Sequence, residues 1–231
     1  MFHFFTFNKS VYVAIIGDIV QSKKIQDRNQ SQKNLKSILD DINLCYSDDI
    51  ASKFMITIGD EFQGLLKYGK NTIEIIRKIE IKMHPVEIRF GVGIGEITTD
   101  INREMPLGTD GPAYYNARKS IENLKNVEKK NRMLESNIMI TSADDNPPVD
   151  LLINSILSLC TTIKSKWTDR QREIAIDSIL NGDNQVKAAE RLGIKQSSVQ
   201  KGLSNAGYYS YKSAMETVSK ALSEIMVVEH V

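Results

Sequence analysis

Two aspartates in the first third of the chain have the side-chain chemistry of a divalent-cation site. Asp18 follows the apolar, strand-like residues 11–17, and Asp60 lies in the tight corner Ile58-Gly59-Asp60-Glu61. Carboxylate oxygens a few ångströms apart suit Mg²⁺, which completes its octahedron with water and substrate phosphates. If the two residues converge, they form a Mg²⁺ site. The alternative is that Asp18 caps the turn after its strand and Asp60 is an ordinary turn residue.

A glycine-rich strand has features of a phosphate contact. Residues 89–96 alternate strictly, so that Arg89, Gly91, Gly93 and Gly95 share one face of the strand. Glycines that share a face indicate the close approach of another group, either a ligand or a helix. Arg89 on this face either reaches an anion or pairs with a carboxylate.

A loop and the helix that follows it form a further candidate for phosphate binding. Residues 106–112 deliver a glycine-bearing loop, with Gly111 near its end, to the N-terminus of a predicted helix. Phosphate oxygens bind favourably at such a terminus. Arg118 and Lys119 lie one to two turns inside the helix. Arg118 with Glu122 at i,i+4 fits a surface ion pair equally well.

Hydrophobic periodicity predicts the elements that must position these residues. Strands are expected at 11–17, 53–58, 61–67 and 86–97, and helices at 30–45, 71–83 and 113–125. Gly59 tolerates a positive φ, so the second and third strands are expected to form a hairpin. The order β-α-β-β-α-β-α is that of a ferredoxin-like, palm-type antiparallel sheet. The predicted fold class is therefore α+β for this part of the chain.

Composition excludes several classes of protein. The 231 residues are 41% hydrophobic and 26% charged with a net charge of +1, the balance of an ordinary soluble globular protein. Apolar stretches fall far short of the roughly 20 residues that cross a bilayer, and the first nine residues lack the features of a secretory signal. We therefore expect a cytoplasmic protein without a membrane partner. Cys45 and Cys160 lack metal-ligand or disulfide spacing and are expected to be buried apolar side chains.

Four segments carry a resemblance to known families: residues 14–20, 57–62, 88–95 and 111–119. In order and interval they resemble the core of class III nucleotide cyclases. The turn Gly59-Asp60-Glu61-Phe62 also resembles the signature turn of diguanylate cyclases, which share the palm fold. The whole chain is similar to the SatD family, a bacterial and archaeal group that combines such an N-terminal domain with a helical C-terminal one.

The resemblance implies roles for individual residues. Cyclase aspartates on the first strand and the hairpin bind two metal ions that activate the ribose 3′-hydroxyl and hold the triphosphate, which implies these roles for Asp18 and Asp60. Matching Ala117 to the alanine of the cyclase Asn-x-Ala-x-Arg helix places Tyr115 and Lys119 where the family has asparagine and arginine. Asn116 and Arg118 stand one residue out of register, a rotation of about 100° on a helix. The departure favours nucleotide binding over cyclase activity. The candidate nucleotide contacts are Arg89, Gly93, Gly95, Gly111, Asn116, Arg118 and Lys119.

A change in sequence character predicts two domains. Residues 142–148 combine adjacent prolines with acidic residues, which interrupt periodic structure. We place a cyclase-like palm domain at 1–145 and a helical domain at 146–231, where every window is helical.

The second domain contains the spacing of a helix-turn-helix at about 168–206. Thr168 is a helix cap, Gly182 ends that helix, and Gly193 makes the turn between helices at 185–192 and 196–203. This segment resembles the DNA-binding helices of LuxR-type proteins and of sigma-factor region four. Val199 and Leu203 are expected in the core. The candidate DNA contacts are Lys195, Gln196, Ser197, Ser198, Gln200 and Lys201.

Three functional hypotheses follow from these motifs. The first is a regulator in which a Mg²⁺–nucleotide bound at Asp18 and Asp60 controls DNA binding, in a homodimer that reads two half-sites. The second is an enzyme, a metal-dependent nucleotide cyclase or nucleotidyltransferase. The third is a palm domain that serves only for dimerisation and requires no metal. For the helical segment, a trihelical protein-interaction module is the alternative to DNA binding, but the acid-free, basic stretch 193–212 favours DNA.

Overall fold

The β-branched and aromatic runs form a single sheet in this computed structural model, which describes residues 5, 7, 10–22, 27–131, 136–142 and 147–225. The strand order is β2-β3-β1-β4-β5. Neighbouring strands are antiparallel except for β4 and β5, which run parallel. The strands are β1 (Tyr12–Ile19), β2 (Ile50–Ile56), β3 (Glu61–Leu66), β4 (Ile88–Gly95) and β5 (Ile138–Thr141).

The first four strands have the predicted ferredoxin-like arrangement, because β1 lies between β3 and β4 and a helix follows both β1 and β3. Strand β5 was not predicted, and it makes the sheet mixed rather than wholly antiparallel. Its 4 residues are too few for hydrophobic alternation to reveal a strand. The helices of this part are α1 (Arg28–Cys45), α2 (Thr72–Met83) and α3 (Pro112–Asn131).

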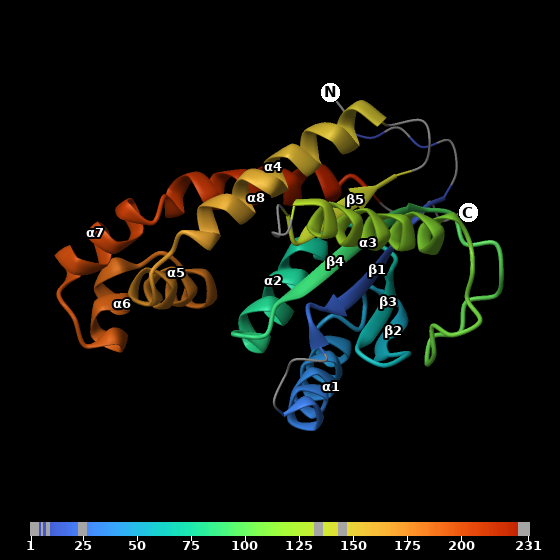
Figure 1. Cartoon of the computed structure of the whole chain (residues 1–231), viewed down its shortest axis with the longest axis horizontal. Helices are drawn as coiled ribbons and strands as arrows, with labels where there is room; N and C mark the ends of the chain where they lie inside the picture. Colours follow the sequence, from blue (N-terminus) through green and yellow to red (C-terminus); the bar gives the residue numbers. More distant parts are fainter. Residues whose placement is uncertain are drawn as a thin grey trace.

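Helices cover both faces of the sheet (Figure 1). Alternate residues of β1 point to opposite faces, so Val13 and Ile15 join the core with α1 and α2, while Ala14 and Ile16 pack with α3. The glycine face of β4 lies beneath α3. A Cβ atom added to Gly93 would stand 2.0 Å from the carbonyl oxygen of Ala113, so only glycine lets the helix approach this closely. Helix packing, the less specific of the two interpretations, explains these glycines.

The rest of the described chain is helical, as expected. Helix α5 begins with a capping box formed by Thr168 and Gln171, Gly182 follows its last residue, and Gly193 ends α6 in the left-handed conformation at φ 63°. Figure 1 shows α5, α6 and α7 grouped at one end of the molecule, away from β2 and β3. The helices are α4 (Pro147–Ser165), α5 (Asp169–Asn181), α6 (Gln185–Leu192), α7 (Gln196–Asn205) and α8 (Tyr208–Leu222).

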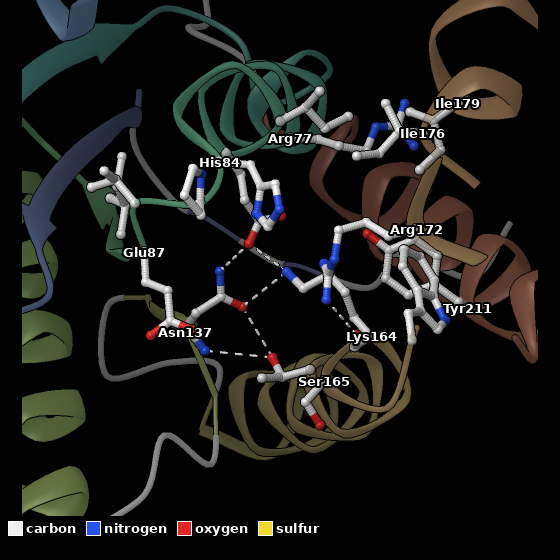
Figure 2. Close-up of a pocket in the computed structure, with 17 residues that line it drawn as sticks. Arg77, His84, Glu87, Asn137, Lys164, Ser165, Arg172, Ile176, Ile179 and Tyr211 are labelled. Carbon is white, nitrogen blue, oxygen red and sulfur yellow. Dashed lines mark hydrogen bonds and ion pairs between the residues drawn. The ribbon is translucent and has the colours of Figure 1, made fainter. Parts of the chain in front are cut away.

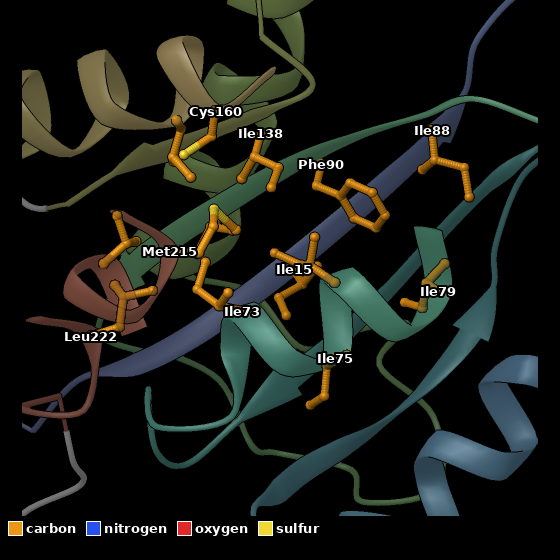
Figure 3. Packing of buried hydrophobic residues seen from close by; sticks show 14 of the residues in the cluster. Ile15, Ile73, Ile75, Ile79, Ile88, Phe90, Ile138, Cys160, Met215 and Leu222 are labelled. Atoms are coloured by element: carbon orange, nitrogen blue, oxygen red, sulfur yellow. The ribbon is translucent and has the colours of Figure 1, made fainter. Parts of the chain in front are cut away.

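The sheet and the later helices α4 to α8 share one hydrophobic core. Cys160 of α4 and Met215 and Leu222 of α8 belong to the same buried cluster as Ile15 and Phe90 of the sheet (Figure 3). The end of α8 also meets the turn before α2, where the Gly69 N–H donates to the carbonyl of Ile225 at 2.9 Å. The predicted division at 145/146 remains a prediction, and residues 143–146 lie outside the described residues.

Two further expectations can be compared with the structure. Cys160 is buried as predicted, but the prediction is wrong for Cys45, which is exposed in the last turn of α1, beyond its final buried residue Ile42. None of the described helices has both the length and the apolar character required to cross a membrane.

Candidate functional site

Three charged residues lie side by side on the three central strands, near one end of each strand. Asp18 of β1 is directly opposite Glu61 of β3 on one side and Arg89 of β4 on the other. Residues directly opposite one another in a sheet project from the same face. Here that face is the one covered by α3, because Ile16 precedes Asp18 by two residues and packs with that helix. These three residues are termed the charged row.

Helix α3 supplies oppositely charged partners at one end of the row. Arg89 donates from Nη1 to Oδ2 of Asp18 at 2.7 Å and from Nε to Oε2 of Glu128 at 2.8 Å. Lys125 Nζ lies 3.2 Å from the same Asp18 oxygen. The Arg89 side chain is 9% exposed, so its guanidinium is held between two carboxylates with little access to water. Such a cation is strongly destabilising to bury unless its partners are present.

The other end of the row is more open. Arg118 of α3 donates from Nη1 to Oε1 of Glu61 at 2.6 Å, and the Arg118 side chain is 48% exposed. Arg118 and Lys125 are seven residues apart, two helical turns, so they lie along the same side of α3. The predicted surface pair of Arg118 with Glu122 is replaced by this contact with the sheet.

Asp60 lies at the hairpin tip and is held from α1 instead. Arg28 makes a bidentate pair with it, from Nε to Oδ1 and from Nη2 to Oδ2, both at 2.9 Å. Gln32 Nε2 donates to Asp60 Oδ1 at 3.3 Å. Burial raises the pKa of Asp60, but hydrogen bonds from Ser22 and Arg28 outweigh it, and the pKa lies below its ordinary value. Asp60 is therefore held as a carboxylate.

The carboxylate that directly faces Asp18 is thus Glu61 rather than Asp60. Asp60 contacts α1, whereas Asp18 contacts α3, so the two aspartates have different sets of partners. Asp18 and Glu61 fit a Mg²⁺ donor set, since the ion is commonly held by one or two carboxylates. Within the described ranges no hydrogen bond reaches Oδ1 of Asp18 or Oε2 of Glu61, and no group of three or more His, Cys, Asp and Glu is placed to hold a metal.

A cavity of about 440 Å³ opens beside the charged row. We call it the α3 cavity, because Tyr114, Tyr115, Arg118 and Lys119 of α3 line it, together with Gln63 of β3 and the 106–110 loop. Two of its lining residues, Thr109 and Tyr114, carry hydroxyls that are closed off from solvent and have no hydrogen-bond partner in the described structure. Buried polar atoms are normally satisfied, so these two indicate a missing partner.

The other predicted nucleotide contacts have structural roles. Gly95, like Gly93, lies under α3, where an added Cβ would stand 2.9 Å from Pro112 Cβ. Gly111 adopts φ +151°, and its Cβ would lie 2.7 Å from the Glu96 carbonyl oxygen. Asn116 donates from Nδ2 to the carbonyl oxygen of Ile94 at 2.9 Å. These residues position α3 and do not line the α3 cavity.

Sequence reasoning missed several residues of the site. Side chains alternate between the two faces of β3, so Glu61 lies on the same face as Leu65, which packs with α3. This alternation could have identified Glu61 from the sequence. Lys125 and Glu128 follow Arg118 at helical spacing. Thr109 and Tyr114 carried no signal, because an unpartnered hydroxyl becomes visible only once the surrounding chain is placed.

The six candidate DNA contacts are all exposed on or just before α7. Val199 and Leu203 of the same helix are buried, with 0% and 1% of their surface exposed, which confirms their predicted place in the core. Gln196 donates to Gln185 of α6 at 2.6 Å and so ties the two helices together.

The ferredoxin-like sheet, extended by the later helices, gives the protein an α+β fold, and the charged row lies on that sheet. The chain belongs to the SatD family, whose profile matches residues 12–222.

The solved structures to which this chain is similar include nucleotide cyclases of low sequence identity. One is the dimeric guanylyl cyclase domain of the RhoGC fusion protein from the aquatic fungus Blastocladiella emersonii, at 14% identity over 48% of this chain and 73% of that one, with a TM-score of 0.37. Another is a bacterial light-regulated adenylyl cyclase, at 16% identity over 69% and 81%, with a TM-score of 0.41. A search of curated proteins found no relative.

Proposed function

We propose that the protein binds a Mg²⁺–nucleotide at the charged row and the α3 cavity, and that the bound nucleotide controls a DNA-binding helix-turn-helix formed by α5, α6 and α7. The observation that carries the first part is the pair of buried hydroxyls without partners, on Thr109 and Tyr114, in a cavity rimmed by Arg118 and Lys119. A nucleoside that enters the cavity gains these two hydroxyls as partners once their side chains turn toward it, and Arg118 and Lys119 are the cations for its phosphates.

The charge pattern supports Mg²⁺ as the companion ion. The two neighbouring acids of the row are each paired with a cation of the protein itself, Asp18 with Arg89 and Glu61 with Arg118. Mg²⁺ and a polyphosphate bring both charges at once: the ion takes carboxylate oxygens, and the phosphates take Arg118 and Lys119. The exchange leaves no charge uncompensated. Asp60 at the adjacent hairpin tip is held by Arg28 and Gln32 of α1, so it joins the complex only if it exchanges these partners for the ion. A bound Mg²⁺ would neutralise and orient the phosphates.

We propose that the protein senses the nucleotide and does not convert it to a product. Tyr115 and Lys119 replace the cyclase asparagine and arginine, and Tyr115 is committed to a hydrogen bond with Asp110 at 2.6 Å. The alternative is an enzyme, a nucleotide cyclase or nucleotidyltransferase using Asp18 and Asp60, and it is separated from the sensor by the formation of product.

The proposed DNA-binding surface is the exposed side of α7. Lys195, Gln196 and Ser197 stand at its N-terminal end, followed by Ser198, Gln200 and Lys201, and all six side chains are exposed. Amide and hydroxyl side chains there suit base edges, and the two lysines suit phosphates. A single unit of this size reads one half-site, so the proposal includes a homodimer.

The test of nucleotide binding is thermal unfolding with each nucleoside triphosphate, with and without Mg²⁺, followed by product analysis of the same samples. A ligand that binds the native state raises the melting temperature. We expect a Mg²⁺-dependent rise without product in the parent, lost in Asp18→Asn and kept in Asp100→Asn, a change at an exposed aspartate. Product would establish the enzyme instead. No rise with any nucleotide would refute the nucleotide site and support a scaffold.

A further inference from the structure

A second cavity lies where the sheet part of the chain meets the later helices, and it borders β4 at Ile88, whose side chain belongs to the core on the face opposite Arg89. Its walls come from α2, the segment that leads into β4, and helices α4, α5 and α8 (Figure 2). We call it the α2–α5 cavity. Its volume is about 190 Å³. An apolar protein cavity of about 150 Å³ holds a benzene ring, so this one has room for a six-membered ring with a small substituent.

One side of the α2–α5 cavity is apolar and aromatic. Trp167 and Tyr211 are 7% and 3% exposed and meet edge to face, with ring centroids 5.2 Å apart. Ile176 and Ile179 of α5 also line the cavity (Figure 2). The Trp167 indole donates to the carbonyl oxygen of Ala206 at 2.7 Å, which fixes the ring in place. This preformed wall suits a flat apolar body.

Two arginines also line the cavity, and within the described residues neither of them forms an ion pair. Among the described residues, no hydrogen bond or ion pair engages the half-buried Arg77 of α2. Arg172 of α5, also half-buried, uses one N–H to the carbonyl oxygen of Lys164 at 3.3 Å and stacks on Trp167, with its Cζ 5.9 Å from the ring centroid. A guanidinium has five N–H donors, so most of this hydrogen-bonding capacity is unused.

Two acids near these arginines, Glu80 and Asp183, have other cations as partners. Glu80, which lines the cavity, pairs with Lys164 and accepts from Asn137 Nδ2 at 2.6 Å. Asp183, whose pKa is lowered in part by Arg77, pairs with Lys212. Glu87 lines the cavity but is exposed. The two arginines therefore give the cavity a surplus of unpaired positive charge beside its aromatic wall.

We propose that the α2–α5 cavity binds a small organic carboxylate with a ring-sized apolar body. The carboxylate accepts hydrogen bonds from Arg77 and Arg172, and the ring packs against Trp167 and Tyr211. Because Arg77 belongs to the sheet part and Arg172 to the first helix of the proposed helix-turn-helix, the ligand ties these two elements together. The proposal is independent of nucleotide binding at the charged row.

The chain supplies its own reporter for this site. Trp167 is the only tryptophan in the sequence and forms part of the cavity wall, so fluorescence excited at the indole band reports occupancy directly. The full chain is titrated with phenylacetate, with the neutral isostere phenylacetamide, and with inorganic phosphate. We expect a saturable change in Trp167 emission with phenylacetate, at least about tenfold weaker binding of the amide, and no change with phosphate.

Variants test the two arginines. Arg77→Gln and Arg172→Gln are each expected to weaken phenylacetate binding by at least about tenfold, since a charge-assisted hydrogen bond is lost. Arg170→Gln, a change at an exposed arginine of the same helix, should leave binding unchanged. If phenylacetate produces no saturable change in the parent protein, if phosphate binds as tightly, or if both glutamine variants bind normally, the proposal is wrong. The parent titrations decide the matter even if a variant fails to fold.

Discussion

Asp18 and Arg89 face each other across β1 and β4, and Arg89 Nη1 donates to Asp18 Oδ2 at 2.7 Å. The same guanidinium also donates to Glu128 of α3. One buried cation thus joins two strands and the helix that covers them, and the residue proposed to meet a metal ion is already part of this arrangement.

Removing that cation should destabilise the fold. In Arg89→Met, the carboxylates of Asp18 and Glu128 lose the guanidinium between them, and within the described residues Lys125 remains as the cation beside Asp18. We expect the free energy of unfolding to fall by about 3–5 kcal/mol, the usual cost of breaking a buried ion pair on one side. Urea denaturation measures it. The exposed Arg103→Met serves as control, and a loss in Arg89→Met no larger than in that control would contradict the assigned role.

The hydroxyl of Tyr114 should have opposite effects on stability and binding. Tyr114→Phe removes a buried polar atom without a partner, so the ligand-free protein should become more stable by about 1–3 kcal/mol. Its nucleotide affinity should fall about tenfold if that hydroxyl contacts the nucleoside. Calorimetric titration and denaturation of the same preparations measure both quantities.

Tyr115→Phe is the matched control for this experiment, because the neighbouring hydroxyl is bonded to exposed Asp110. It should produce neither the gain in stability nor a comparable loss of affinity. Equal behaviour of the two variants would exclude a specific role for Tyr114.

The close approach of α3 to β4 predicts intolerance of a single methyl group. In Gly93→Ala, the new Cβ would meet the Ala113 carbonyl oxygen at 2.0 Å, and the backbone of α3 must move. We expect a loss of about 1–3 kcal/mol or more from overpacking. Gly202→Ala, where the new atom meets only the flexible end of Ile174, should cost far less because alanine also favours the helix. Similar losses in both variants would argue against the tight packing.

The ion pair of Asp177 with Arg191 predicts a pH dependence in the helical part. Arg191 donates to both Asp177 oxygens, at 2.8 and 2.6 Å, and this hydrogen bonding holds the pKa of Asp177 below its ordinary value of 3.8. A lowered pKa in the folded state stabilises the fold above the unfolded-state pKa, and the contribution is lost as pH falls through the folded-state pKa.

Asp177→Asn should therefore be less stable than the parent at pH 7, and the difference should shrink progressively below pH of about 4. Thermal unfolding across this range measures the difference, with Asp100→Asn as the exposed control. A stability difference that stays constant down to pH 2 would show that the ion pair is not its source.

Salt dependence tests the proposed DNA surface. Each lysine that contacts a phosphate releases about one counterion, so the slope of log affinity against log salt concentration should fall by about one in Lys195→Gln and in Lys201→Gln. Fluorescence anisotropy with duplex DNA gives the slope. Lys36→Gln on α1 removes one positive charge from an exposed pair with Asp40 and should leave the slope unchanged. If the slopes of Lys195→Gln and Lys201→Gln are as unchanged as that of Lys36→Gln, these two lysines do not contact DNA phosphates.

The central fold could be predicted from the sequence because most of its helices and strands have local sequence signals. Leu35, Ile38, Leu39 and Ile42 recur at helical spacing and are all buried on α1, and Gly193 ends α6 in the left-handed conformation that the turn requires. The site was less accessible, since Asp18 and Arg89 are 71 residues apart and their pairing depends on strand register.

Strand β5 and the packing of the later helices were missed for related reasons. Ile138–Thr141 is too short to show a period, and its pairing with β4 depends on contacts outside the strand itself. Asn154 of α4 accepts from and donates to the backbone of Ile140, at 2.8 and 2.7 Å, a bond that nothing in the intervening sequence indicates. The prolines at 147 and 148 are expected from the sequence to interrupt periodic structure, but in the structure they form the first turn of α4.

The contact between α8 and Gly69 has a consequence for how the chain folds during synthesis. An added Cβ at Gly69 would lie 2.0 Å from the Leu222 carbonyl oxygen, so the end of α8 sits directly on the turn before α2. Until α8 has left the ribosome, Ile73 on α2 lacks part of the apolar surface that buries it in the finished protein. A nascent chain that already contains every strand of the sheet therefore still exposes the apolar surface around Ile73. A chaperone that covers this surface during translation should raise the yield of folded protein.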